Sequence, residues 1–270
     1  VKIGLLDVDN YNRTPKYPNL ALMKLSAWHK AQGDTVEWWF GFERYDRVYM
    51  SRVFDDTYTK DFPFCIDATE TIKGGTGYGL DNKLPDEIEH IYPDYSIYPT
   101  LTKDTAYGFL TRGCPRGCHF CIVAEKEGRR SVKAADLSEW WRGQKNIVLM
   151  DPNLLAYKGH MDLLQQLIES EAWVDINQGI DCRLLTEQNI DAINQIKLKN
   201  IHFAWDYMHE EKRVAATPND VKKYVADGHK VLVEVNAGAG ALHMDADYIA
   251  AGLGRAISQG IMKNPVQFRT

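Results

Sequence analysis

Three of the chain's five cysteines lie within eight positions of the segment TRGCPRGCHFCIVAEKEGRR, residues 111–130. Cys114, Cys118 and Cys121 form a C-x3-C-x2-C pattern, which follows a predicted strand and opens the next predicted helix. Thiolates are soft ligands that suit iron–sulfur clusters, zinc and copper(I). Four cysteines normally complete a four-iron cluster, so three would leave one iron open to a ligand from outside the protein. The pattern therefore predicts a metal site.

Three other interpretations compete with an open iron–sulfur cluster. A zinc site would need a fourth ligand, which His119 or His160 could supply, but the first gap of three residues is unusual in zinc ribbons. A cluster of the bacterial ferredoxin type would show C-x2-C-x2-C and a distant fourth cysteine. Structural burial of the three thiols is disfavoured because Arg112, Arg116 and His119 lie around and between them.

The same segment resembles the signature of radical S-adenosylmethionine (radical SAM) enzymes, in which an aromatic residue, here Phe120, precedes the last cysteine. TRGCPRGCHFC is similar to the S/T-R-G-C-P-x-x-C-x-F-C version found in members with a cobalamin-binding-type domain. EGRRSVKAADLSEW, residues 127–140, resembles the G-R-x-x-R/V stretch that those members place next. The resemblance implies an enzyme, so the alternative from another class is a non-catalytic iron–sulfur or zinc protein that engages a partner through its first domain.

The resemblance also implies the cofactors. Cys114, Cys118 and Cys121 would bind a [4Fe–4S] cluster whose unique iron chelates the amino and carboxylate groups of S-adenosylmethionine. An electron from a donor such as flavodoxin or ferredoxin would then cleave this cofactor to methionine and a 5′-deoxyadenosyl radical. That radical would abstract a hydrogen atom from a substrate, which the sequence does not identify, and no catalytic residue is assigned.

Composition sets wider limits on the function. The chain has 270 residues, 44% hydrophobic and 26% charged, which allows one large or two modest domains. The net charge of −5 and the pI of about 5.9 do not indicate nucleic-acid binding. No leader segment or apolar run of membrane-spanning length is found. The cysteines show no disulfide framework, so we expect a cytoplasmic protein.

The first hundred residues read as a Rossmann-like domain. Apolar runs predict strands over 1–9, 35–40 and 47–54, and helical spacing predicts a helix that stops near Gly33. PNLALMKLSAWHKAQGDTVEWW, residues 18–39, resembles the first helix and second strand of cobalamin-binding-type domains. The cobalamin-ligating pattern Asp-x-His-x-x-Gly is absent, so cobalamin is not expected. The stretch 74–80 is expected to be a turn and 84–99 a linker.

From residue 101 onward, strands and helices alternate. Strands are predicted over 107–111, 146–151, 173–178, 200–206 and 230–236, with a sixth beginning near 266. Helices are predicted over 134–141, 160–169, 187–196, 219–226 and 246–258. Such alternation implies parallel strands with helical crossovers, either an open α/β sheet or a partial (β/α) TIM-type barrel. A complete eight-unit barrel needs about 250 residues, more than residues 101–270 provide.

Parallel α/β sheets carry their chemistry at the carboxyl ends of the strands. We therefore expect one rim that binds S-adenosylmethionine, formed with Phe120 by Asp151, Asn153, Gln178, Asp181, Arg183 and Asp206. Trp205 and Glu234 would lie on the same rim. The competing interpretation is that polar residues at strand ends simply cap the following helices.

The other two cysteines are assigned more modest roles. Cys182 is read as a buried structural residue, with hydrogen-atom donation to a substrate radical as its alternative role. Cys65 is read as part of the hydrophobic core. The segment 241–265 resembles no part of the radical SAM family.

Overall fold

The computed structural model describes residues 1–203, 217–228, 230–232, 244–252 and 267–269. The chain divides into two compact units. The first unit comprises Val1–Tyr107 with Ser138–Arg142, and the second comprises Gly108–Leu137 with Gly143–Thr270. None of the helices in the described ranges has both the length and the apolar character needed to cross a membrane.

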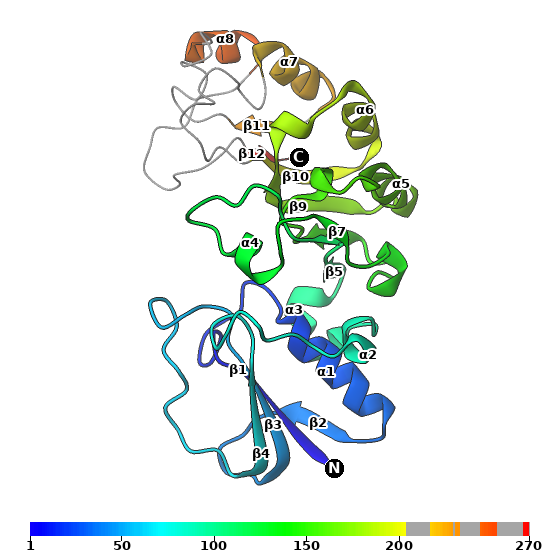
Figure 1. Cartoon of the computed structure of the whole chain (residues 1–270). Helices are drawn as coiled ribbons and strands as arrows, with labels where there is room; N and C mark the ends of the chain where they lie inside the picture. The colour runs from blue at the N-terminus through cyan, green and yellow to red at the C-terminus, as the bar shows by residue number, and fades with distance from the viewer. Residues whose placement is uncertain (204–216, 229, 233–243, 253–266, 270) are drawn as a thin grey trace. The chain divides into compact units, whose positions relative to one another are not determined.

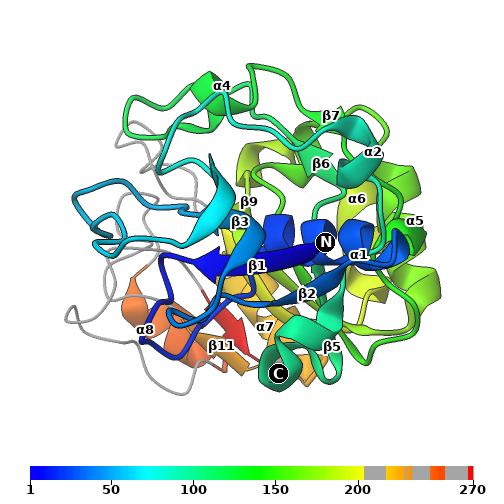
Figure 2. The same cartoon turned by 90° about the horizontal axis from the view of Figure 1, so that it is seen from below.

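The first unit contains a four-stranded parallel sheet in the order β2-β1-β3-β4. Figure 2 shows β1 between β2 and β3. The strands are β1 (Lys2–Asp7), β2 (Thr35–Trp38), β3 (Tyr45–Ser51) and β4 (Ala68–Gly74). The first three lie where the apolar runs predicted them. β4 was not predicted, because its sequence ATETIKG has few apolar residues and most of its side chains are partly or fully exposed.

Both faces of β1 are packed, as its alternating side chains require. On one face, Ile3 and Leu5 pack with Leu22 and Leu25 of α1 (Leu20–Ala31). The other face joins a second cluster around Tyr45, formed by Leu6, Val8, Val48, Met50 and Phe62. α1 begins at Asn19, whose side-chain oxygen accepts a hydrogen bond from the backbone nitrogen of Leu22.

The segment 84–99 is not a linker, contrary to the expectation from its composition. It contains α2 (Asp86–Glu89) and η1 (Tyr95–Ile97), and α3 (Pro99–Thr102) follows directly. The side chains of Ile88 and Tyr98 are buried, and the backbone nitrogen of Asp94 donates to the carbonyl of Met23 in α1. Helices this short carry no detectable hydrophobic period, which explains why the sequence pattern missed them.

A six-stranded sheet has the order β11-β12-β10-β9-β8-β5, and all of its strands except β5 lie in the second unit. Its strands are β5 (Thr105–Gly108), at whose end the two units divide, β8 (Asn146–Leu149), β9 (Trp173–Ile180), β10 (Leu198–Phe203), β11 (Lys230–Leu232) and β12 (Gln267–Arg269). β8 and β10 both run parallel to β9, so the α/β class is confirmed. The sixth strand departs from the expectation of an all-parallel sheet, because β12 is antiparallel to both β10 and β11. A TIM-type barrel stays a prediction.

Helices α5 (His160–Ser170), α6 (Glu187–Gln195), α7 (Pro218–Ala226) and α8 (Asp245–Ala250) lie within or close to predicted helices (Figure 1). The helix expected over 134–141 is wrong: only the turn η2 (Leu137–Glu139) forms there. The backbone nitrogen of Leu137 donates to the side-chain oxygen of Gln166 in α5 at 2.8 Å. A side chain of another element thus takes the donor that an α-helix would use internally.

Candidate functional site: the cysteine loop

The three clustered cysteines lie on one loop of the second unit, residues 113–131, called here the cysteine loop. It is closed at its base by a two-stranded antiparallel ladder of β6 (Thr111–Arg112) and β7 (Val132–Lys133). Within the loop, the backbone nitrogen of Cys114 donates to the carbonyl of Gly128 at 3.2 Å, and that of Cys121 to Cys118 at 3.0 Å. The helix expected after the cysteines is a single turn, α4 (Val123–Lys126).

Two glycines give the cysteine loop its shape. Gly113 has a φ of +83° and Gly117 a φ of +57°, a backbone region that residues with a side chain rarely adopt. A Cβ at Gly113 would overlap the carbonyl oxygen of Arg130, and one at Gly117 would overlap the guanidinium of Arg129. The backbone conformation favours glycine at both positions, and at Gly113 a side chain would also overlap main chain, whereas at Gly117 it would overlap only the end of a flexible side chain.

The thiols are accessible. Cys121 is exposed, Cys114 and Cys118 are half-buried, and none of the five cysteines, all within the described residues, forms a disulfide. Across the described part of the chain, no three Cys, His, Asp or Glu side chains are gathered closely enough to hold a metal ion. Cys65 is exposed, so its assignment to the core is wrong, and Cys182 is half-buried.

Asp151, immediately beyond the end of β8, holds the base of the cysteine loop. Its carboxylate accepts hydrogen bonds from the backbone nitrogens of Leu110 and Thr111, at 3.0 and 2.5 Å, and from the Thr111 hydroxyl at 2.6 Å. Only 2% of Asp151 is exposed. Burial raises the pKa of its carboxyl group to about 6, although the hydrogen bonds from Thr111 and Leu110 act in the opposite direction.

Asn153 brings the next turn of chain against the cysteines. Its side-chain nitrogen lies 3.6 Å from Cys114 Sγ, within the range of a weak N–H···S hydrogen bond. Its backbone oxygen accepts from the hydroxyl of Ser131, at the other end of the loop. The residue is 3% exposed, and its Oδ1 is buried with no hydrogen-bond partner among the described residues. A buried acceptor of this kind, next to a thiol, is a candidate ligand-binding group.

A charged cluster joins the cysteine loop to the end of β9. Asp181 caps η4 (Cys182–Leu184) and pairs with Arg183 through two contacts, at 2.6 Å from Nε and 2.5 Å from Nη2. Arg116, between the first two cysteines, reaches the same carboxylate at 3.4 Å. Arg116 therefore links the predicted residues Asp181 and Arg183 to the loop. Arg116 itself was not among the predicted site residues.

The remaining predicted site residues are less closely connected to this cluster. Gln178 is exposed on β9, and Phe120 is 60% exposed, with its ring 5.1 Å from that of His119. Asp206, with Trp205 and Glu234, lies outside the described residues.

Glu127 is a further residue that the sequence analysis missed. Its carboxylate accepts from Arg112 Nη1 at 2.8 Å and from the backbone nitrogen of Gly113 at 2.9 Å, tying the end of α4 to the loop's first residue. An acidic residue directly before the glycine of a turn was the available signal in EKEGRR.

The donor types suit a soft metal, although the described structure does not gather the three thiols closely enough to hold one. Three thiols on one loop, next to a buried amide oxygen without a partner, offer sulfur ligands for iron and an acceptor for a small ligand beside them. The arginines at Asp181 add donors that suit a carboxylate.

Comparison with known proteins gives matches that cover only part of the chain. The chain is 28% identical over 137 residues to the ribosomal protein uS12 methylthiotransferase RimO of Leptospira biflexa serovar Patoc, in strains Ames and Paris alike. The match covers 46% of this chain and 30% of RimO, so the chain spans less than a third of that relative's length.

Another match concerns the carboxyl-terminal region and a different class of protein. Residues 207–258 match the model of the alanine dehydrogenase/PNT N-terminal domain. The alanine dehydrogenase of Methanococcus maripaludis is 48% identical over 44 residues, which cover 16% of this chain and 12% of that enzyme. Of the matched segment, the structure describes α7, β11 and α8. The similarity to RimO, by contrast, fits the radical SAM superfamily that the cysteine motif resembles.

Proposed function

We propose that this protein is a radical SAM enzyme that acts on a substrate still to be identified. The observation that carries the proposal is the placement of Cys114, Cys118 and Cys121 on one loop whose first cysteine contacts Asn153, beyond the end of β8. Parallel α/β sheets bind their ligands at this edge. The partial similarity to RimO supports the same class of enzyme.

In this proposal the three cysteines bind a [4Fe–4S] cluster and leave one iron open to S-adenosylmethionine. When bound, this pair of cofactors supplies a 5′-deoxyadenosyl radical for hydrogen abstraction. Asn153 Oδ1, buried and without a partner in the described residues, would accept a hydrogen bond from the cofactor's ammonium group. Arg183, oriented by Asp181, would donate to its carboxylate.

Asp151 has a different role from the one expected from its position in the sequence. Its carboxylate is committed to Leu110 and Thr111, so we assign it to positioning the cysteine loop and not to cofactor contact. Phe120, Gln178 and Asp206 keep their predicted roles at the cofactor. The division into a Rossmann-like domain (1–100) and a partial barrel (101–270), an electron donor such as flavodoxin or ferredoxin, and the absence of cobalamin also stay predictions.

Neither relative determines the reaction. RimO transfers a methylthio group to a ribosomal protein, as its name states, but the match covers 30% of its length. The similarity to alanine dehydrogenase covers 44 residues, and the family-model match lies in 207–258, far along the chain from the cysteine loop.

Anaerobic reconstitution with iron and sulfide tests the proposal. The wild-type chain, given dithionite and S-adenosylmethionine, should release 5′-deoxyadenosine, measured by chromatography. Cys118→Ser should abolish this product, whereas Cys65→Ser, at the exposed cysteine outside the loop, should leave it unchanged. Iron binding without S-adenosylmethionine affinity in calorimetry would favour the non-catalytic iron–sulfur protein instead.

A further inference from the structure

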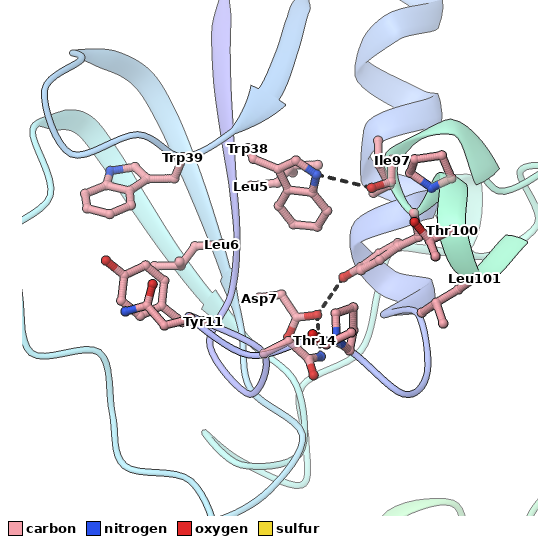
Figure 3. A pocket seen from close by; sticks show the side chains of 15 residues that line it. Leu5, Leu6, Asp7, Tyr11, Thr14, Trp38, Trp39, Ile97, Thr100 and Leu101 are labelled. Atoms are coloured by element: carbon pink, nitrogen blue, oxygen red, sulfur yellow. Dashed lines mark hydrogen bonds between the residues drawn. The ribbon is translucent and has the colours of Figure 1, made fainter.

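The first unit contains a cavity of about 380 Å³ at the carboxyl ends of β1 and β2 (Figure 3). The residues that line it come from these two strands, from the loop after β1 and from the segment 97–101. The carboxyl edge of a parallel sheet is the usual place for a ligand. The volume falls in the range of small-molecule sites.

Aromatic rings form much of the wall, and they are held in place. The indole nitrogen of Trp38 donates to the carbonyl of Ile97 at 3.2 Å, and its ring meets that of Tyr98 edge-on at 5.1 Å. Trp39 and Tyr11, also in the wall, have ring centroids 6.5 Å apart. An aromatic wall attracts a cation through the negative faces of its rings.

One buried carboxylate lies among these rings. Asp7, at the end of β1, is 7% exposed and lines the cavity. Its Oδ2 accepts from the hydroxyl of Tyr98 at 2.6 Å and from the amide of Asn10 at 2.8 Å, as Figure 3 shows. Its Oδ1 has no hydrogen-bond partner within the described structure.

The charge of Asp7 is not neutralised by the protein around it. Both side chains that bond to it are uncharged, and no ion pair to it is found among the described residues. Burial raises the pKa of Asp7, and the negative charge of Asp9 acts in the same direction. A buried carboxylate of this kind needs either a proton or a cationic partner.

We propose that the cavity binds a small organic cation, an apolar or aromatic body with one ammonium group that donates to Asp7 Oδ1. The ammonium would neutralise the carboxylate, and the rings of Trp38, Trp39 and Tyr11 would cover the apolar body. The site lies in the first unit and does not depend on the cysteine loop.

Calorimetry on the full chain with three probes of nearly equal shape tests the charge requirement. Tryptamine carries an ammonium group, tryptophol a hydroxyl in its place, and indole-3-acetate a carboxylate. Tryptamine should bind at least tenfold more tightly than tryptophol, and indole-3-acetate should not bind measurably. Equal binding of tryptamine and tryptophol would mean that Asp7 is protonated and takes a neutral ligand, which overturns the proposal, as would no binding of tryptamine.

Three variants locate the effect. Asp7→Asn should reduce the preference for tryptamine over tryptophol to less than twofold. Asp9→Asn removes an equal charge two residues away, outside the cavity lining, and should keep the preference. If Asp7→Asn and Asp9→Asn lost the preference for tryptamine equally, the proposal would be overturned. Should Asp7→Asn fail to fold, Thr100→Trp remains: it fills the exposed rim of the cavity and should weaken tryptamine binding at least tenfold. Unchanged binding in Thr100→Trp would place the ligand elsewhere.

Discussion

The carboxylate of Asp151, beyond β8, accepts hydrogen bonds from both the backbone nitrogen and the hydroxyl of Thr111, three residues before Cys114. A fully buried acid thus fixes the point at which the cysteine loop leaves the sheet. Placing the loop at the carboxyl edge is the first requirement of the proposed cluster site.

Asp151 should make stability depend on pH in a defined direction. Its pKa is about 6 in the folded chain, above the ordinary value of 3.8, so between these values only the folded state holds the proton. The stabilisation that Asp151 contributes to the free energy of unfolding is therefore fully present below about pH 4 and is lost as the pH rises through 6. A pKa shift of this size corresponds to a loss of about 3 kcal/mol. Urea unfolding of wild type and Asp151→Asn at pH 4 to 7 measures it as the difference between the two proteins.

Asp136 provides a control of opposite sign. Hydrogen bonds from Lys133 and Gln166 lower the pKa of its carboxyl group, so its contribution is present above the ordinary value and is lost as the pH falls. The difference between wild type and Asp136→Asn should therefore grow with rising pH. If the difference in unfolding free energy between wild type and variant changed with pH in the same direction for Asp151→Asn and Asp136→Asn, the two pKa directions would be contradicted.

Gly113 and Gly128 form a matched pair in the cysteine loop. Both have a positive φ, +83° and +96°, but a Cβ at Gly113 would overlap the carbonyl oxygen of Arg130, whereas one at Gly128 would meet nothing within 4 Å. Gly128→Ala should cost about 1–2 kcal/mol of unfolding free energy, the backbone penalty alone. Gly113→Ala should cost clearly more and should also lower the iron retained after reconstitution. Equal costs would show that the loop can yield at Gly113.

Asn153 should affect cofactor affinity and leave cluster binding intact. Asn153→Ala removes the buried Oδ1 beside Cys114, so S-adenosylmethionine should bind the reconstituted protein about tenfold or more weakly, the value of one hydrogen bond to a charged group. Asn200→Ala, in the same unit and bonded to Asp175, is the control and should leave affinity unchanged. Loss of iron together with affinity in Asn153→Ala would mean that the residue only supports the loop.

The two arginines that contact Asp181, Arg183 and Arg116, should stabilise the folded protein unequally. Arg183 makes two close contacts with the carboxylate, whereas Arg116 makes a single one at 3.4 Å. Double-mutant cycles by urea unfolding should give a coupling of about 1.5–3 kcal/mol for Arg183 and below about 1 kcal/mol for Arg116. A larger coupling for Arg116 would show that the loop is anchored more strongly to β9 than this geometry implies.

The sequence predicted the regular elements well where burial imposes a period. β1, α1, β8, α5 and β9 are apolar runs or helices with a buried stripe, and each forms close to its predicted bounds. The prediction failed where tertiary contacts decide. No helix forms at 134–141, where the Leu137 nitrogen bonds instead to Gln166, distant in sequence. β12 joins the sheet antiparallel, a choice that no local pattern specifies.

The sequence indicated which residues lie around the cysteine loop but not the contacts that they make. The C-x3-C-x2-C spacing pointed to the three thiols, whose metal stays a prediction, and the strand ends pointed to Asn153, Asp181 and Arg183, which lie near the loop. No sequence pattern could show that Asp151 turns its carboxylate to Thr111, or that Asp7 is buried among rings in the first unit. Both features arise from contacts between residues far apart in the sequence, which only the folded chain brings together.

Electron paramagnetic resonance of the reconstituted, dithionite-reduced chain, recorded before and after S-adenosylmethionine is added, tests the proposed cluster and its open iron. A cluster held by Cys114, Cys118 and Cys121 has one iron open to this molecule, so its spectrum should change on addition. We expect that change in wild type and in Cys65→Ser. A spectrum that S-adenosylmethionine leaves unaltered, or bound zinc in place of iron, would contradict it.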